Sequence, residues 1–209
     1  MLKLKTVGLP RRTQAERSAA TRTRILEAAI ASLYRHGYGA TTTVMVAATA
    51  KVSRGAMLHH FPSKADLMLA TLAEVMQRSA ANFQAAASRI DDAWERYAAL
   101  PDLRLESALE PAGVAFMEIM VGARSDEAVS ERLDEFRVRL APRPAQRMAD
   151  WARASGVEVT DRDQAVSRTV SLAILGLAIQ KQVLPGIDTE EVLTVLRDLK
   201  RGAMEPAGH

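Results

Sequence analysis

Apolar side chains recur at the spacing of an α-helix along most of this chain, and no stretch shows the strict alternation of a half-buried strand. The first clear stripe lies within residues 21–36, and Gly37 ends it at a position typical of a helix C terminus. The apolar residues of this stripe are Ile25, Leu26, Ala29, Ile30 and Leu33. Further helices are expected over residues 64–89, within 91–108 as a short helix with Trp94 and Tyr97 that is followed by a break at Pro101, and over 111–123, 161–184 and 188–202. Another helical stretch is expected over 126–155, interrupted near residue 141 by Pro142 and Pro144. The sequence therefore predicts an all-α fold.

Helix-capping residues divide the segment 37–67 into two very short helices and the start of a long third. Threonine hydroxyls precede the first apolar run, Ser53 can cap the second helix, and Ser63 with Asp66 forms a capping pair for the third. Helices this short are marginal in isolation, so they must pack against the longer helices beside them. Two short helices joined by a tight turn predict a helix-turn-helix, whose second helix, about residues 53–60, enters the DNA major groove.

Residues of fixed type recur at fixed spacing through this segment. They are Gly37-Tyr38, Thr41-Thr42, Val46-Ala47, Ala50 to Ser53, Gly55 to Leu58, His60-Phe61 and Lys64 to Leu67. The pattern, over roughly residues 20–67, resembles the DNA-binding module of the TetR family of bacterial transcriptional regulators. Two positions depart from it: Lys51 replaces a turn glycine and would have to accept that turn conformation, and Leu58 replaces a tyrosine that commonly reaches a phosphate. We interpret both as changes in operator preference or affinity.

Charge is segregated along the chain, although its net value is only +3. Residues 1–64 carry 11 basic and 2 acidic side chains, whereas residues 65–209 carry 17 basic and 23 acidic ones. The N-terminal part is therefore at +9 and the remainder at −6. This separation predicts a polyanion-binding surface in the first part alone.

Residue chemistry assigns the expected DNA contacts. Threonine hydroxyls and backbone N–H groups at a helix N terminus can bond phosphate, although Thr42, Ser53 and Ser63 also serve as helix caps. Arg54, the first residue of the recognition helix, is the candidate for a guanine O6/N7 contact, and small residues after it let the backbone approach the groove. The full expected set is Thr42, Thr43, Ser53, Arg54, Gly55, Ala56, Leu58, His59, His60 and Lys64.

Charge and helix pattern divide the chain into three parts. Residues 1–17 are expected to form a basic flexible arm, either a disordered, solvated tail or an arm that adds phosphate or minor-groove contacts. Residues 18–66 form the predicted helix-turn-helix domain. Residues 67–209 form a predicted helical domain, which the resemblance to the TetR family implies binds an effector and dimerises. The helix that begins at Lys64 joins the two domains and is a candidate lever between them.

The run Val170–Ile179 is apolar around most of the helix circumference, so more than one side of this helix must be covered. Because a lone subunit would leave too much of that surface exposed, the last two helices are expected to form a dimer interface. The interface residues are expected to be Val170, Ile174, Leu177, Leu193 and Leu196. The resemblance to the TetR family likewise implies that the C-terminal domain dimerises and binds a ligand.

Aromatic and methionine side chains of the C-terminal part can line an apolar pocket between helices, where small-molecule sites often lie. Such residues at helical spacing also form ordinary core, and the sequence leaves both interpretations open. The pocket candidates are Trp94, Tyr97, Phe116, Met117, Met120, Phe136, Met148 and Trp151. Because few of their neighbours are charged, an apolar or amphipathic effector is expected.

Enzyme and metal motifs are missing from the sequence. The chain has no cysteine, which excludes disulfides and thiolate metal sites. His59 and His60 lack the i, i+4 spacing of a zinc site, and no P-loop, Gly-x-Ser-x-Gly or Gly-x-Gly-x-x-Gly motif occurs. We therefore expect no catalysis, metal or cofactor.

No apolar run is long enough for a membrane span, and the N terminus does not form a signal peptide. A cytoplasmic protein without a membrane partner is therefore expected.

The sequence thus predicts a sequence-specific, DNA-binding transcriptional regulator that acts as a dimeric repressor. The resemblance implies that two recognition helices meet successive major grooves of a palindromic operator and that a bound effector spreads them apart. Two alternatives stay open. One is a DNA-binding regulator without a small-molecule effector, acting as an activator or under the control of a partner protein. The other is a helical interaction protein, against which the segregated positive charge argues.

Overall fold

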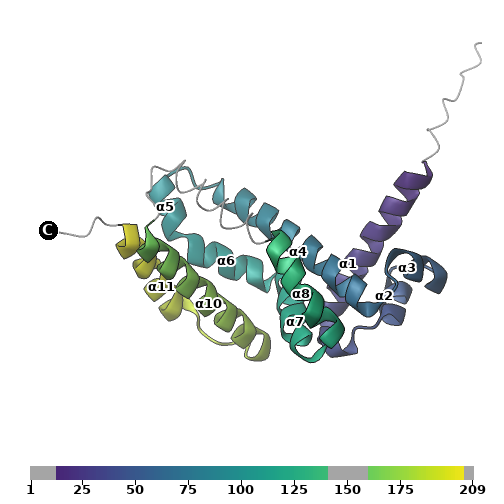
Figure 1. The fold of residues 1–209 in the computed structure, drawn as a ribbon. Helices are drawn as coiled ribbons and strands as arrows, with labels where there is room; N and C mark the ends of the chain where they lie inside the picture. Colours follow the sequence, from purple (N-terminus) through teal and green to yellow (C-terminus); the bar gives the residue numbers. More distant parts are fainter. Residues whose placement is uncertain (1–12, 141–159, 205–209) are drawn as a thin grey trace, which may run out of the picture.

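Every regular element in the described part of this computed structural model, residues 13–140 and 160–204, is a helix. The elements are α1 (Gln14–Ala40), α2 (Thr43–Thr49), α3 (Arg54–His60), α4 (Lys64–Ala87), α5 (Ala93–Ala98), α6 (Leu100–Leu109), α7 (Pro111–Gly122), the 3-10 helix η1 (Ala123–Ser125), α8 (Glu127–Leu140), α10 (Asp161–Val183) and α11 (Glu190–Met204). Helices α1 to α3 lie at one end of an elongated molecule and α5, α10 and α11 at the other, with α4 running between them (Figure 1). The all-α prediction is confirmed.

Local hydrogen bonds fix where the short helices begin, as the sequence predicted. The hydroxyls of Thr42 and Ser53 each accept a hydrogen bond from the backbone N–H three residues later, at 3.2 and 3.1 Å. Ser63 and Asp66 form a complete capping box at the start of α4. Each such cap stabilises its helix by about 1 kcal/mol, so α2, α3 and α4 start at defined residues.

Helix α1 begins earlier than the sequence pattern indicated. Thr13 and Glu16 form a capping box, with the Thr13 N–H donating to Glu16 Oε2 at 2.7 Å. Residues 14–17, which were expected to belong to a flexible arm, are therefore helical, because this polar cap starts the helix before the apolar stripe begins. The rest of the expected arm, residues 1–12, lies outside the described residues.

As predicted, Pro101 follows the end of the short helix that carries Trp94 and Tyr97, α5. It lies in the first turn of α6, where a proline needs no N–H partner and its fixed φ suits the helix. Residues 91–109 therefore hold two helices, α5 and α6, joined directly. The expected interruption at Pro142 and Pro144 lies outside the described residues.

Among residues 13–140 and 160–204, two adopt positive φ angles, and both lie in the N-terminal part of the fold. Gly37, at φ 74°, is the one non-helical position within α1, in agreement with the prediction that it ends the first helical stripe. Lys51, at φ 53°, makes the turn between α2 and α3. The lysine has therefore accepted the left-handed conformation in which a glycine would be free of steric conflict.

Replacing Lys51 by glycine is expected to stabilise the fold by about 0.5–1 kcal/mol. A side chain at a left-handed position costs about 1–2 kcal/mol, and the greater entropy of glycine in the unfolded chain offsets part of that gain. Urea unfolding of the two proteins measures the difference. Lys51→Ala, which keeps the Cβ atom, serves as the control and should show no such gain; equal stabilisation by alanine would mean that charge, not conformation, is responsible.

Two hydrophobic clusters form the interior of the part of the chain that the structure describes. The first, here called the N-terminal core, joins α1 to α4 with α7, η1 and α8, and its members from the last three elements are Ala115, Ile119, Ala123 and Val129. The second, the C-terminal core, joins α6 and α7 to α10 and α11. Phe116 of α7 packs against both clusters, so α7 connects the two halves of the molecule.

The residues expected at a dimer interface face the interior of their own subunit instead. Val170, Ile174, Leu177, Leu193 and Leu196 are all buried in the C-terminal core, each with at most 7% of its surface exposed. The physical reason is that α6 and α7 cover this side of α10 and α11. The apolar run Val170–Ile179 is indeed covered on one side, but within the subunit.

Candidate nucleic-acid interface

Helix α3 presents one face to solvent and anchors the other in the N-terminal core. Met57 and Phe61 are buried, at 1% and 3% exposure, whereas Arg54, Leu58 and His59 are exposed. The interpretation of Met57 and Phe61 as core is therefore confirmed. Arg54 makes no hydrogen bond or ion pair with any described residue, so its five donors are available to a partner outside the chain.

The N-terminal caps leave a hydrogen-bond donor available at the start of each short helix. Thr42 and Ser53 accept hydrogen bonds from their own helices, but each hydroxyl retains its proton for donation. Both residues are exposed, and Thr43 is half-buried. Capping and phosphate contact are thus compatible roles for the same side chain.

Positive groups gather where α3 ends. The Arg22 guanidinium of α1 lies 5.5 Å from the centre of the Phe61 ring, and the rings of His59 and His60 are 5.4 Å apart. Burial is the main cause that lowers the pKa of His60, and the charges of the nearby His59 and Arg22 lower it further. His60 is therefore more readily neutral than an isolated histidine in the free protein, and a phosphate placed here would favour its protonated form.

Lys64, one of the expected phosphate contacts, is engaged inside the protein. Its Nζ donates to the backbone carbonyl of Tyr38 at 3.1 Å and lies 4.2 Å from the centre of the Tyr38 ring. The side chain is half-buried between α4 and the last turn of α1. In the free subunit this ammonium group is thus bound to Tyr38, and a phosphate contact by Lys64 stays a prediction.

Tyr38 joins the DNA-binding helices to α7 and η1, a role that sequence reasoning missed. Its backbone N–H donates to Glu118 Oε2, and its hydroxyl donates to Asp126 Oδ2, both at 2.7 Å. Burial and the hydrogen bond to Asp126 raise the pKa of Tyr38. The backbone of Gly122 packs directly against the Tyr38 ring. A Cβ atom at this position would lie 2.1 Å from Tyr38 Cγ, so there is no room for a larger residue. Glu118 is the one charged residue of apolar α7, a signal that could have revealed this contact.

A second link connects the start of α4 with α8. Arg132 Nη1 lies 2.9 Å from Asp66 Oδ1, and the hydrogen bond from Ser63 is the main reason that the pKa of Asp66 is lowered. Asp66 is thus both a helix cap and an interhelical ion-pair partner. The helix-turn-helix is attached to the rest of the subunit at the end of α1 and at the start of α4.

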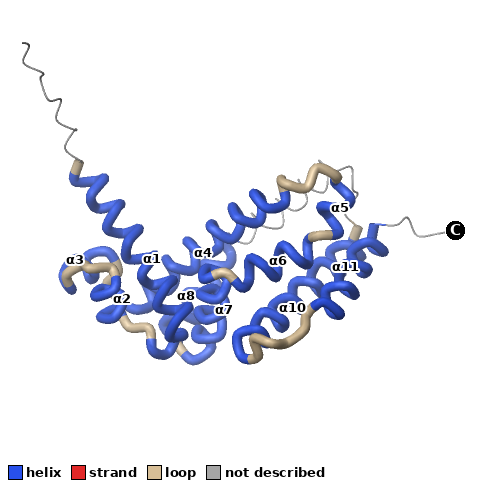
Figure 2. Tube along the Cα trace, turned by 180° about the vertical axis from the view of Figure 1, so that it is seen from behind, coloured by secondary structure: helices blue, strands red, loops and turns tan. Residues whose placement is uncertain are grey.

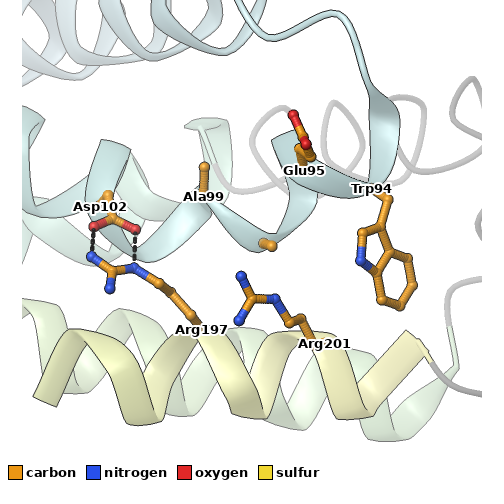
Figure 3. A pocket seen from close by; sticks show the side chains of 7 residues that line it. Trp94, Glu95, Ala99, Asp102, Arg197 and Arg201 are labelled. Carbon is orange, nitrogen blue, oxygen red and sulfur yellow. Dashed lines mark hydrogen bonds and ion pairs between the residues drawn. The ribbon is translucent and has the colours of Figure 1, made fainter. Parts of the chain in front are cut away.

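A pocket of about 550 Å³ lies between α5, α6 and α11 (Figure 3). Arg197 spans it with a bidentate ion pair to Asp102, at 2.5 and 2.9 Å, and these bonds raise the pKa of Arg197. Trp94 and Arg201 stand on opposite helices beside the remaining space, and Trp94 is 41% exposed. The volume is within the range of small-molecule sites.

The residues expected to line one effector pocket are dispersed. Trp94 lines the pocket just described, whereas Tyr97 and Met117 are buried and Phe116 packs on both cores. Met120 is 41% exposed on α7. Phe136 lies on α8, but its side chain is outside the described structure, as are Met148 and Trp151.

Beneath the pocket, a buried polar cluster connects α5, α10 and α11. Lys200, 1% exposed, donates to Ser167 Oγ at 2.9 Å, and its Nζ lies 3.7 Å from the centre of the Tyr97 ring. The Tyr97 hydroxyl donates to Asp163 at 3.4 Å. Burial is the main cause that lowers the pKa of Lys200 to about 8, and the positive charge of Arg104 lowers it further. Burial also raises the pKa of Tyr97 to about 12, and the negative charge of Asp163 adds to this shift.

Helices α10 and α11 also expose large apolar side chains to solvent, here called the outer apolar face. Its members follow helical spacing on both helices, so each helix contributes one stripe. They are Leu172, Leu175, Ile179 and Val183 of α10 and Val192, Val195 and Leu199 of α11.

Among the described residues, no helix is long and apolar enough to cross a membrane, and no cluster of three potential metal-binding side chains occurs.

Comparison with known proteins agrees with this arrangement. The model of the family "Bacterial regulatory proteins, tetR family" matches residues 25–71, the segment that holds α2 and α3. The HTH-type transcriptional regulator Rv2912c of Mycobacterium tuberculosis is 32% identical over 184 residues, which cover 86% of this chain and 92% of the relative. The chain belongs to the TetR family. It is therefore a DNA-binding transcriptional regulator and not an enzyme.

Solved structures of the TetR-like fold extend the match to the C-terminal helices. A transcriptional regulator from Saccharomonospora viridis in complex with choline superposes with a TM-score of 0.64 at 25% identity, covering 86% of this chain and 95% of that one. The multidrug binding protein EbrR complexed with ethidium gives a TM-score of 0.60 at 23% identity, covering 86% and 97%. The second likeness shows a shared fold.

Proposed function

We propose that this TetR-family protein is a dimeric repressor that leaves a palindromic operator when a small effector binds. The observation that carries the proposal is the exposed face of α3, where Arg54 stands unpaired within an N-terminal part of charge +9. A cytoplasmic site of action suits this role. Two such helices, one per subunit, would read successive major grooves.

The proposed dimer forms through the outer apolar face. Its seven residues leave more apolar surface exposed on adjacent helices than a lone subunit usually presents. Pairing α10 and α11 with the same helices of a second copy would cover this face and would leave α1 to α3 of each subunit free (Figure 1).

The effector is proposed to enter between α5, α6 and α11, next to Trp94, and to be apolar or amphipathic. The relatives bound to choline and ethidium support a small organic ligand for the C-terminal domain. A shift of α7 would reach the helix-turn-helix through Glu118 and Tyr38, because α7 belongs to both cores. The effector would then favour the subunit arrangement that fits the operator poorly.

Selection of bound sequences from a random duplex pool, followed by salt-titrated binding, tests the proposal. A palindrome should be enriched and should bind far more tightly than random duplex. Arg54→Ala should lose about 1–3 kcal/mol at each half-site, or roughly 30-fold to 25,000-fold in affinity for the dimer, mainly on the operator. Arg89→Ala, an exposed arginine beyond α4, is the control. No enriched sequence, or equal binding by Arg54→Ala, would contradict the proposal.

The dispersal of the expected pocket residues favours a second candidate function. Tyr97, Phe116 and Met117 pack inside the subunit and do not line a pocket together. In this second candidate function, the protein binds DNA without a small-molecule effector, either as an activator or under the control of a partner protein. A thermal-shift screen of cationic, apolar and acidic small molecules separates the two. Stabilisation that Trp94→Ala abolishes supports the small-molecule effector.

A further inference from the structure

Helix α1 projects beyond the body of the molecule. Residues 14–20 are all exposed, and the first buried side chain along the helix is Ile25. The segment 14–24, here called the α1 extension, is therefore about 16 Å of helix without a buried side chain, and it touches the N-terminal core only near its base. Figures 1 and 2 show this projecting helix from opposite sides.

The composition of the α1 extension shows what kind of partner fits it. Its apolar residues are three alanines, so it offers no stripe that another protein could bury. It carries Arg17, Arg22 and Arg24 against one acid, Glu16, and Glu16 is already used in the cap with Thr13. Over the first 24 residues the sequence has seven basic side chains and one acidic one. A polyanion is the complementary partner.

Contacts with α3 place the extension next to the DNA-reading surface. Arg22 lies over Phe61, the residue that caps the C terminus of α3, at 5.5 Å from the ring centre. The free end of α1 and helix α3 lie at the same end of the molecule (Figure 1). A duplex bound to the exposed face of α3 would therefore continue past the base of the extension.

We propose that the α1 extension binds the phosphate backbone of the DNA that flanks the half-site read by α3. This inference rests on the proposed function, since it assumes that α3 docks on an operator. Arg17 and Arg24 are seven residues apart and so share one face of the helix. Neither forms an ion pair with another described residue. Arg24 Nη2 donates one long hydrogen bond to Thr21 Oγ1 at 3.4 Å within the same helix, which leaves its other donors available to phosphates. The extension adds affinity without adding sequence preference.

The test compares the full-length protein with the variant Arg17→Gln/Arg24→Gln on two duplexes, the operator palindrome alone and the palindrome with about ten extra base pairs on each side. The flanks should raise the affinity of the wild type and leave that of the variant unchanged. The slope of log affinity against log salt should fall by about 0.9 for each phosphate that the variant no longer neutralises, which corresponds to about eightfold in affinity at 0.1 M salt. Arg22 is left intact because it contacts Phe61.

Arg89→Gln/Arg162→Gln is the control, because it removes the same charge from exposed arginines at the end of the molecule opposite α3. It should keep the wild-type slope and the benefit of the flanks. Equal losses in the two double variants would mean that only net charge matters and would overturn the α1 inference. An unchanged slope in Arg17→Gln/Arg24→Gln, with tight operator binding, would overturn the inference alone. Failure of the wild type to prefer any palindrome would overturn the proposed function as well.

Discussion

Leu172→Arg is expected to yield monomers whose operator affinity is lower by about 100-fold or more. Leu172 is 66% exposed within the subunit, so the arginine should leave the subunit fold intact. In the proposed dimer the same charge would enter a desolvated apolar surface, where an unpaired ion is strongly unfavourable. A monomer engages one half-site at a time and loses the gain of about 100-fold to 10,000-fold that linked binding provides.

Light scattering and band-shift titration measure the two effects of Leu172→Arg. Met120→Arg is the matched control, since it places the same charge on an exposed apolar residue of α7, outside the outer apolar face. The control should remain dimeric and bind normally. A dimeric Leu172→Arg protein with wild-type affinity would place the interface elsewhere. Leu177 is unsuitable for this purpose, because at 6% exposure its replacement would disrupt the C-terminal core.

Gly122→Ala is expected to destabilise the protein by about 1–3 kcal/mol, the usual cost of overpacking. The added Cβ would lie between 2.1 and 2.6 Å from three atoms of the Tyr38 ring. The ring cannot move aside freely, because its hydroxyl is bound to Asp126 and Lys64 lies over its face. Relief of the clash would therefore separate α7 from the end of α1 and weaken operator binding too.

Urea unfolding and operator titration of Gly122→Ala test this contact. Gly39→Ala is the local control, because no atom lies within 4 Å of a Cβ built at that exposed glycine. It should match or slightly exceed the wild type in stability, as alanine favours a helix. If Gly122→Ala behaved like Gly39→Ala, the close packing of Tyr38 on α7 would be disproved.

The start of α2, α3 and α4 could be predicted from the sequence because helix caps are local. Thr42, Ser53 and the Ser63–Asp66 pair each act within three residues, so the printed sequence contains the whole interaction. The turn at Lys51 was anticipated from the resemblance to the TetR pattern, in which this position is a glycine. The capping box that begins α1 at Thr13 is equally local. It was missed because the start of this helix was predicted from the apolar stripe, which begins further along the chain.

The dimer surface could not be assigned from periodicity, since α10 is apolar on two sides. Ile174 and Leu175 are neighbours in sequence, yet one is buried against α6 and α7 and the other faces solvent. The side of α10 that becomes buried is decided by α6 and α7, which lie more than fifty residues away in the sequence. Lys200 makes the same point: no local pattern marks a lysine that will be buried over the ring of Tyr97.

The extent of the N-terminal core has a consequence for gene fusions and for the evolution of such chains. A cut at residue 66 would pass through the first turn of α4 and remove Leu67, Leu72, Ile119 and Val129, all of which complete the packing around α1. The recognition helix therefore cannot be exchanged as an independent unit. A chimera that borrows residues 1–66 from a relative will fold well only if α4, α7, η1 and α8 are transferred with them. New operator preferences should therefore arise more readily by substitution on α3 than by recombination.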